Sequence, residues 1–98
     1  AEAEFNNKLN TLRTQIDVID HQLIEVLGKR MKVSDGIGKL KKANNVAVLQ
    51  SKRWNEILGK MILEGEQNSL SEEFVLRMFK AIHQESINHQ EKIFREDQ

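Results

Sequence analysis

Two cations interrupt the apolar stripe of a long helical pattern, and their positions are the first indication of a binding site in this sequence. Between residues 9 and 42, apolar side chains recur at alternating spacings of three and four, which is typical of an amphipathic helix. Arg30 and Lys41 continue this rhythm at places where a core favours leucine. A buried charge is costly unless an opposite charge pairs with it, and Asp35, the acidic residue between them, points elsewhere. The pattern therefore predicts that a ligand supplies the missing anion.

Helix geometry indicates the size of that anion. Arg30 and Lys41 differ by roughly 20° around the helix axis and by about 16 Å along it, so their long side chains could hold a small dianion between them. Arg13, a third cation beside the stripe, lies about 26 Å before Arg30 and cannot reach the same small ligand within one straight helix. A contribution from Arg13 therefore requires a second chain.

A later segment shows the same kind of interruption. The apolar rhythm between residues 75 and 93 places Ser86 and Gln90, one helical turn apart, on the face that should meet the core. A buried hydroxyl or amide requires a hydrogen-bond partner. A ligand held by the two cations would supply one, so Ser86 and Gln90 join the candidate site. The alternative for each residue taken alone is a satisfied polar residue of the core or a contact in a dimer interface.

Three helices must position these side chains. We expect them to span about residues 5 or 9 to 43, 50 to 64 and 71 to 94, with residues 1–8 frayed. Gly65 is the expected C-terminal cap of the second helix, and Ser69 or Ser71 the expected N-terminal cap of the third. Gly36 and Gly38 leave room near Lys41 for a ligand or another helix. The histidines show no metal-like spacing and are expected to be solvated, whereas Trp54 is expected to pack.

The first helix needs a partner. About 34 residues of helix extend about 50 Å, whereas a compact domain of this size has a radius of gyration of about 13 Å. We therefore predict an all-α fold with three helices per chain, in which residues 1–98 form a single domain of a helical homodimer.

Composition and charge narrow the possible functions. The 98 residues include 39% hydrophobic and 31% charged residues, with no net charge, no proline and no cysteine, as in a cytoplasmic helical protein without disulfides. The sequence suggests no membrane span, no metal site and no cofactor. Residues 29–53 carry eight Lys or Arg against one Asp, but no recognition motif accompanies them, so we predict no nucleic-acid binding. A non-catalytic helical dimer that binds nucleic acid through this band is the alternative of another class.

Several short motifs together resemble the all-helical chorismate mutases. They are Leu12-Arg13 with Ile16-Asp17 and Ile19-Asp20, Lys29-Arg30, Gly38-Lys39-Leu40-Lys41, Arg53, and Glu85-Ser86-Ile87-Asn88-His89-Gln90. The likeness runs in register from about Leu9 to Gln90 without a gap. It implies three helices per chain and two chains intertwined through the long first helix. It also implies cofactor-free rearrangement of chorismate to prephenate, in phenylalanine and tyrosine synthesis, by an isomerase that is often fused to another enzyme of this pathway.

The resemblance implies a role for each site residue. Arg30, together with Arg13 from the partner chain, would bind the two carboxylates of chorismate. Lys41 would hydrogen-bond a carboxylate and the ether oxygen, Gln90 would donate to that same oxygen, and Ser86 would contact a carboxylate. The catalytic residues are then Lys41, Gln90 and Arg30. Because the reaction needs no nucleophile, base or metal, catalysis would come from holding the reactive conformer and stabilising charge on the ether oxygen.

The second predicted helix departs from the family pattern. Arg53 would support the carboxylate end of the substrate. The family commonly has an Asp three residues before this Arg and a Glu directly after it, which help to hold the ring hydroxyl. Here those places are Gln50, which can still hydrogen-bond a hydroxyl, and Trp54, which offers one indole donor. An isochorismate–pyruvate lyase, whose substrate carries its hydroxyl elsewhere on the ring, is therefore the alternative activity.

Overall fold

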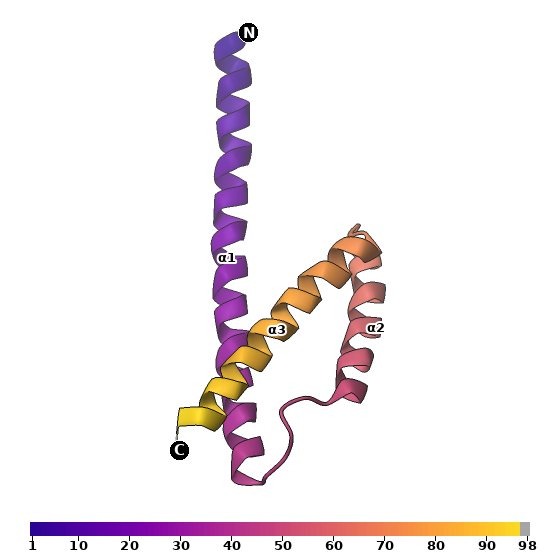
Figure 1. Ribbon diagram of the computed structural model, residues 1–98. Coiled ribbons are helices and arrows are strands. Elements are labelled where there is room, and N and C mark those ends of the chain that lie inside the picture. Colours follow the sequence, from indigo (N-terminus) through magenta and orange to yellow (C-terminus); the bar gives the residue numbers. More distant parts are fainter. Residues whose placement is uncertain (97–98) are drawn as a thin grey trace. The chain divides into compact units, whose positions relative to one another are not determined.

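The computed structural model describes residues 1–96, and all regular structure in them is helical (Figure 1). The helices are α1 (Glu2–Ala43), α2 (Ser51–Gln67) and α3 (Glu72–Glu96). The predicted all-α fold with three helices and one very long first helix is confirmed. None of the described helices combines the length and the apolar character needed to cross a membrane.

The start of α1 differs from the expected boundary, whereas its end and the cap of α3 agree with the prediction. α1 begins at Glu2, so residues 2–8 are helical rather than frayed. It ends at Ala43, the expected boundary, and Asn45 just beyond this end adopts a φ of 56°. Ser71 Oγ accepts a hydrogen bond from the Phe74 N–H at 3.2 Å, which identifies Ser71 as the cap of α3.

Residues 1–32, the first of two structural units, are helical from Glu2 onward and belong to α1. None of these residues, all of which the structure describes, is buried. The side chains of its apolar stripe are 51–59% exposed at Leu12, Ile16, Ile19 and Leu23. This unit therefore presents an apolar face and has no core of its own.

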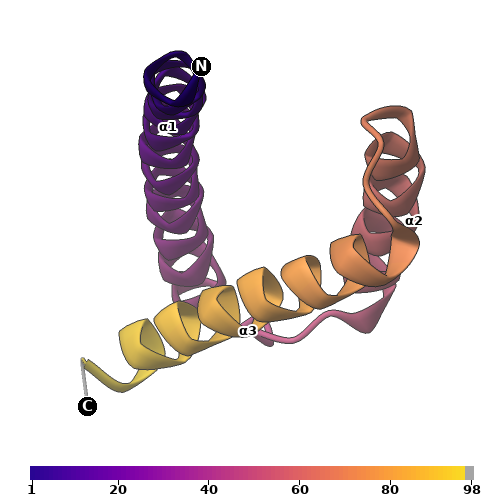
Figure 2. The same ribbon diagram turned by 90° about the horizontal axis from the view of Figure 1, so that it is seen from above.

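Residues 33–98, the second unit, contain the C-terminal part of α1 together with α2 and α3. α2 and α3 pack together as a helical hairpin, with a short turn between them (Figure 2). Val75 is 1% exposed and is the buried hydrophobic side chain of the described residues. A Cβ added to Gly65 would lie 2.5 Å from Val75 Cγ2. The predicted C-cap role of Gly65 is therefore wrong: the glycine lies inside α2, where it makes room for Val75, and Asn68 occupies the cap.

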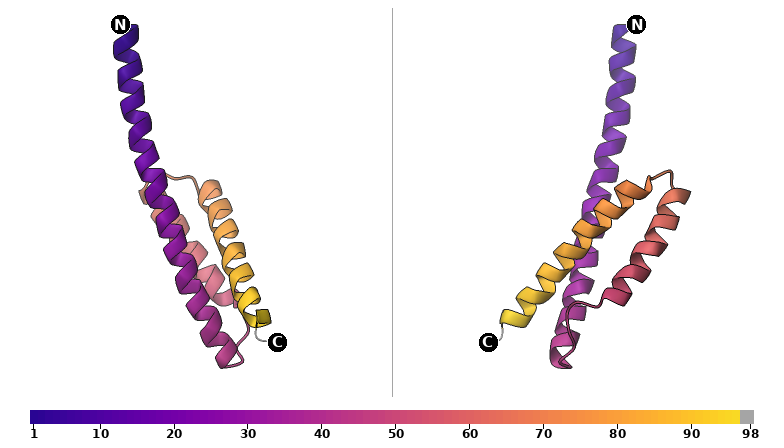
Figure 3. Two further views of the ribbon diagram at one scale, coloured as in Figure 1. Left: turned by 90° about the vertical axis from the view of Figure 1, so that its left-hand side faces the viewer. Right: turned by 45° about the vertical axis from the view of Figure 1, so that its right-hand side comes forward.

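The C-terminal half of α3 lies against residues 34–42 of α1 (Figure 3). Gly38 of α1 lies close to Gln90 of α3, because a Cβ added to this glycine would stand 3.0 Å from Gln90 Cγ. Farther along, Lys42 Nζ donates to the Ile93 carbonyl at 2.9 Å. The expectation that a glycine near Lys41 admits another helix is confirmed for Gly38, whereas nothing lies within 4 Å of a Cβ on Gly36.

Candidate functional site

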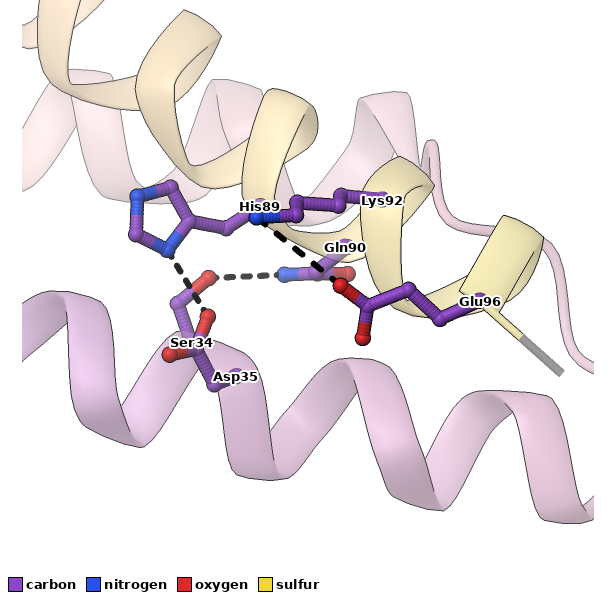
Figure 4. Close-up of polar contacts among 6 residues, drawn as sticks. All are labelled: Ser34, Asp35, His89, Gln90, Lys92 and Glu96. Carbon is purple, nitrogen blue, oxygen red and sulfur yellow. Dashed lines mark hydrogen bonds and ion pairs between the residues drawn. The ribbon is translucent and has the colours of Figure 1, made fainter.

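Gln90 is the centre of the polar contacts in the second unit. It is 8% exposed and is held by α3 against α1, where Gly38 provides the space. Its Nε2 donates to Ser34 Oγ at 3.0 Å (Figure 4), and its Oε1 accepts from Lys41 Nζ at 3.4 Å. Because an ammonium group can only donate, the amide oxygen must be the atom that faces Lys41. The chemistry of its neighbours therefore fixes which way the amide points.

Lys41 is held by the chain segment that follows α1. The Val46 N–H donates to the Lys41 carbonyl at 2.8 Å, which turns the backbone back toward the helix end. Lys41 Nζ then donates to the Val48 carbonyl at 2.8 Å. The half-buried ammonium has three hydrogens, and Val48 and Gln90 account for two within the described residues. The third is available to an external acceptor.

Ser86 lies one turn before Gln90 on α3 and is 7% exposed. With Val75, these two residues are the buried positions of α3. The sequence predicted that both polar side chains face inward, and the structure confirms it. α3 thus presents a hydroxyl and an amide one turn apart on its buried face.

The two remaining stripe cations belong to the first unit. Arg30 is half-buried, and this burial lowers the pKa of its guanidinium because desolvation disfavours the charged form. Arg13 is exposed. A partly desolvated guanidinium gains more from a bound anion than a fully hydrated one does, because water competes less for the contact.

The candidate residues of the second helix, Gln50 and Arg53, form no hydrogen bond or ion pair with Lys41 or Gln90 within the described residues. Gln50 is the N-cap residue of α2 and makes no side-chain cap hydrogen bond, and both it and Arg53 are exposed. Lys41 and Gln90 are thus brought together, whereas Gln50 and Arg53 are not brought to them.

Trp54, which occupies the place of the expected glutamate, packs on α3. Its ring stacks on that of His83 with centroids 4.1 Å apart and an interplanar angle of 17°. The packing role predicted for Trp54 is confirmed, whereas the expectation that His83 is a solvated histidine is wrong. Half-buried rings stacked in this way stabilise the contact between α2 and α3.

Two further contacts were missed at the sequence level. Asp35 was expected to point away from Arg30 and Lys41 and was given no partner, and His89 was expected to be solvated, yet His89 Nδ1 lies 2.8 Å from Asp35 Oδ1 (Figure 4). Ser34 had no predicted role, although it falls between Arg30 and Lys41 in the same rhythm, is 5% exposed and is bonded to Gln90. The sequence offers one clue to these contacts, which is that the partners are neighbours in the chain. Ser34 contacts Gln90, and the next residue, Asp35, contacts the residue before it, His89.

The chemistry that these side chains offer is hydrogen-bond donation to an anion. Lys41 supplies an ammonium, Gln90 an amide and Ser86 a hydroxyl, with each side chain half-buried or buried. Among the described residues, no group of three or more acidic or histidine side chains could hold a metal ion. The donor set suits an oxygen atom that becomes negatively charged during a reaction.

Comparison with known proteins identifies relatives along nearly the whole chain. The bifunctional chorismate mutase/prephenate dehydratase of Buchnera aphidicola subsp. Acyrthosiphon pisum is 30% identical over 90 residues, which are 92% of this chain and 23% of that protein. The protein of the same description from Escherichia coli is 26% identical over 90 residues, with the same two coverages of 92% and 23%. The T-protein of Haemophilus influenzae is 27% identical over 82 residues, which are 84% of this chain and 22% of that protein.

The chain therefore spans less than a quarter of the length of these relatives. Residues 12–91 also match the sequence model of the family described as chorismate mutase type II. With most of its length inside this match and all of its described regular structure helical, the chain belongs to the chorismate mutase type II family.

Proposed function

We propose that this chain is an isomerase that converts chorismate to prephenate without a cofactor, for phenylalanine and tyrosine synthesis. The observation that carries the proposal is the buried Gln90 amide, whose oxygen faces Lys41 and whose nitrogen faces Ser34. Family membership supplies the substrate class, and the pair of donors supplies the chemistry. An arrangement that only stabilised a helix crossing would not need an ammonium group beside a buried amide.

Lys41 and Gln90 would both donate hydrogen bonds to the ether oxygen of chorismate. As the carbon–oxygen bond of chorismate breaks, electron density accumulates on this oxygen before the new carbon–carbon bond is complete. A hydrogen from Lys41 and one from Gln90 would stabilise this charge more in the transition state than in the substrate, which raises kcat rather than merely tightening binding. Neither residue needs to gain or lose a proton in this role.

The two carboxylates of the substrate would be held by the cations. Arg30 and the partner's Arg13 would each take one carboxylate, with Lys41 and Ser86 adding contacts and Arg53 supporting the same end. Fixing both carboxylates holds the substrate in the conformer whose reacting carbons are close together. Positioning of this kind lowers the barrier without any chemical participation by the protein.

A second copy of the chain completes this proposal. The exposed apolar stripe of residues 1–32 lacks cover within one chain, and a homodimer intertwined through α1 would bury it. The same arrangement would bring Arg13 to the partner's site. It would also make residues 1–98 a single domain in the assembly, because the first unit has no core of its own.

The proposal extends to the fusion of this chain with another enzyme and to its location in the cell. Relatives of this chain are bifunctional proteins by name, and the chain spans less than a quarter of their length. We therefore propose fusion to, or association with, another enzyme of aromatic biosynthesis, in the cytoplasm.

Gln50 would hydrogen-bond the ring hydroxyl in place of the usual carboxylate.

One assay tests the proposal and its alternatives. The purified chain is incubated at neutral pH with chorismate and, separately, with isochorismate, and the products are separated and identified. Formation of prephenate, insensitive to added salt, supports the mutase and excludes a dimer that only binds nucleic acid. Release of pyruvate from isochorismate, without prephenate from chorismate, would favour the lyase. The lyase is the second candidate because Trp54, stacked on His83, stands where the family commonly has a glutamate.

A further inference from the structure

We infer that Ser34 is a positioning residue that fixes the Gln90 amide with a hydrogen directed at the substrate. The inference rests on the proposed function, because it assigns the geometry of a donor in that reaction. Ser34 itself touches no reacting atom in this scheme. Its effect on catalysis would pass entirely through Gln90.

The contact between Ser34 and Gln90 is the stronger of the two that hold the amide. Ser34 Oγ accepts from Gln90 Nε2 at 3.0 Å, which is near the ideal distance for such a bond. The Lys41 Nζ to Gln90 Oε1 distance is 3.4 Å, at the long end where hydrogen bonds are weak. Lys41 alone would therefore restrain the amide poorly.

Rotation of the amide is otherwise easy. The last torsion of a glutamine side chain is broad and nearly two-fold, so the oxygen and nitrogen can exchange places at little cost. A flipped amide would present its oxygen to the ether oxygen of the substrate and repel the charge that develops there. Lys41 opposes this flip because its ammonium cannot accept from an amide N–H, and the Ser34 hydroxyl completes the restraint by accepting one hydrogen of Nε2. Within the described residues the second hydrogen has no acceptor, so it is left for the substrate.

The burial of the pair makes the restraint effective. Ser34 is 5% exposed and Gln90 is 8% exposed, so water competes little for either group. The contact lies one residue from the Asp35–His89 pair, whose side chains are 36% exposed and which joins the same two helices (Figure 4). Asp35 therefore provides a control that perturbs the same helix crossing without touching the amide.

The test is a double-mutant cycle on the dimeric enzyme with chorismate. Loss of one orienting hydrogen bond in Ser34→Ala should lower kcat about tenfold, with KM within about twofold of the wild type. In the Gln90→Ala background, Ser34→Ala should change kcat by less than about twofold, because the group that it orients is gone. Asp35→Ala should lower thermal stability slightly and keep kcat within about twofold of the wild type.

A measurement without substrate accompanies the cycle. The side-chain amide resonances of Gln90, identified by their loss in Gln90→Ala, should shift in Ser34→Ala and stay in place in Asp35→Ala. Unchanged kcat in Ser34→Ala, or an equal fall in both backgrounds, would overturn the positioning role while leaving the proposed activity intact. A wild-type chain that forms no prephenate would overturn both, and the resonances would then report only a structural contact.

Discussion

Gly38 of α1 lies directly against Gln90 of α3. A Cβ built on Gly38 would stand 3.0 Å from Cγ, 3.2 Å from Cα and 3.3 Å from Cβ of Gln90. These distances are shorter than ordinary van der Waals contact, so the separation of the two helices at this point depends on the missing side chain. The glycine thereby determines how deeply the Gln90 amide sits beside Lys41 and Ser34.

Gly38→Ala should therefore reduce activity more than stability. The added methyl group must push Gln90 by a few tenths of an ångström, which weakens its contacts with Ser34 and Lys41. Alanine is also better than glycine in a helix by about 1 kcal/mol, which offsets part of the packing cost. We expect kcat for chorismate to fall about tenfold, since small displacements of positioned groups are costly, while the unfolding midpoint changes by only a few degrees.

Gly36→Ala is the matched control for that change. It lies two residues earlier on the same helix, and nothing lies within 4 Å of a Cβ built there. The helix-propensity gain of about 1 kcal/mol should then appear in full as a higher urea midpoint, with kcat unchanged. Equal effects of the two substitutions on kcat would contradict the role given to the Gly38 contact.

Lys41→Ala should abolish most of the turnover with the fold intact. Removal of one donor aimed at developing charge costs about 10²–10³ in kcat, and Lys41 also restrains the amide of Gln90. Steady-state kinetics with chorismate would measure the loss, and circular dichroism would check the helix content. Lys39→Ala, which removes an exposed lysine two residues earlier on α1, should leave kcat within about twofold. A Lys41→Ala enzyme with the wild-type rate would remove this residue from the site.

The pH dependence follows from the neutral amide. Gln90 does not titrate, and desolvation lowers the pKa of Arg30 from a strongly alkaline value. The pKa of Arg30 is therefore lower in the folded chain than in the unfolded chain, and the free energy of unfolding rises with pH only through that alkaline range. Between pH 5 and 8 Arg30 is charged in both states. We therefore expect kcat to change little across this window.

Gln90→Glu should convert that flat profile into one that requires acid. A protonated carboxyl group can donate to the ether oxygen, whereas the ionised form has no hydrogen and repels the developing charge. Turnover by the variant should rise as pH falls and the carboxylate becomes protonated, while the wild-type profile measured beside it stays level. A variant as active at pH 8 as at pH 5 would show that position 90 does not act as a donor.

Much of the fold could be predicted from periodicity. Spacings of three and four identified the helices, and the same rhythm showed that Ser86 and Gln90 face inward although both are polar. Ser71 and Asn45 carry local signals that act within one turn, so their roles could also be read from neighbouring residues. These features share one property, which is that each depends on residues close together in the chain.

The remaining features depend on which helix faces pack together and on which residues lie opposite each other where two helices cross. Ser34 and Gln90 are 56 positions apart, and Asp35 and His89 are 54 apart. Periodicity gives each of these side chains a direction but not a partner. Gly65 shows the same limit, since glycine near a helix end usually indicates a cap and only its contact with Val75 reveals another reason for it.

The proposed exchange of Arg13 between chains can be tested by mixing two inactive variants. Arg13→Ala and Lys41→Ala chains are unfolded, mixed in equal amounts and refolded, so that about half of the dimers contain one chain of each kind. If Arg13 acts in the partner's site, each such dimer has one intact site and one site with both defects. The mixture should then recover about a quarter of the wild-type activity.

The control mixture combines Lys41→Ala with Gln90→Ala. These two side chains contact each other within one chain, so every site in a mixed dimer keeps one defect and no activity should return. Recovery in the first mixture alone therefore assigns Arg13 to the opposite chain from Lys41. Absence of recovery in both, with mixed dimers demonstrated by mass spectrometry, would place Arg13 in the site of its own chain or outside the site.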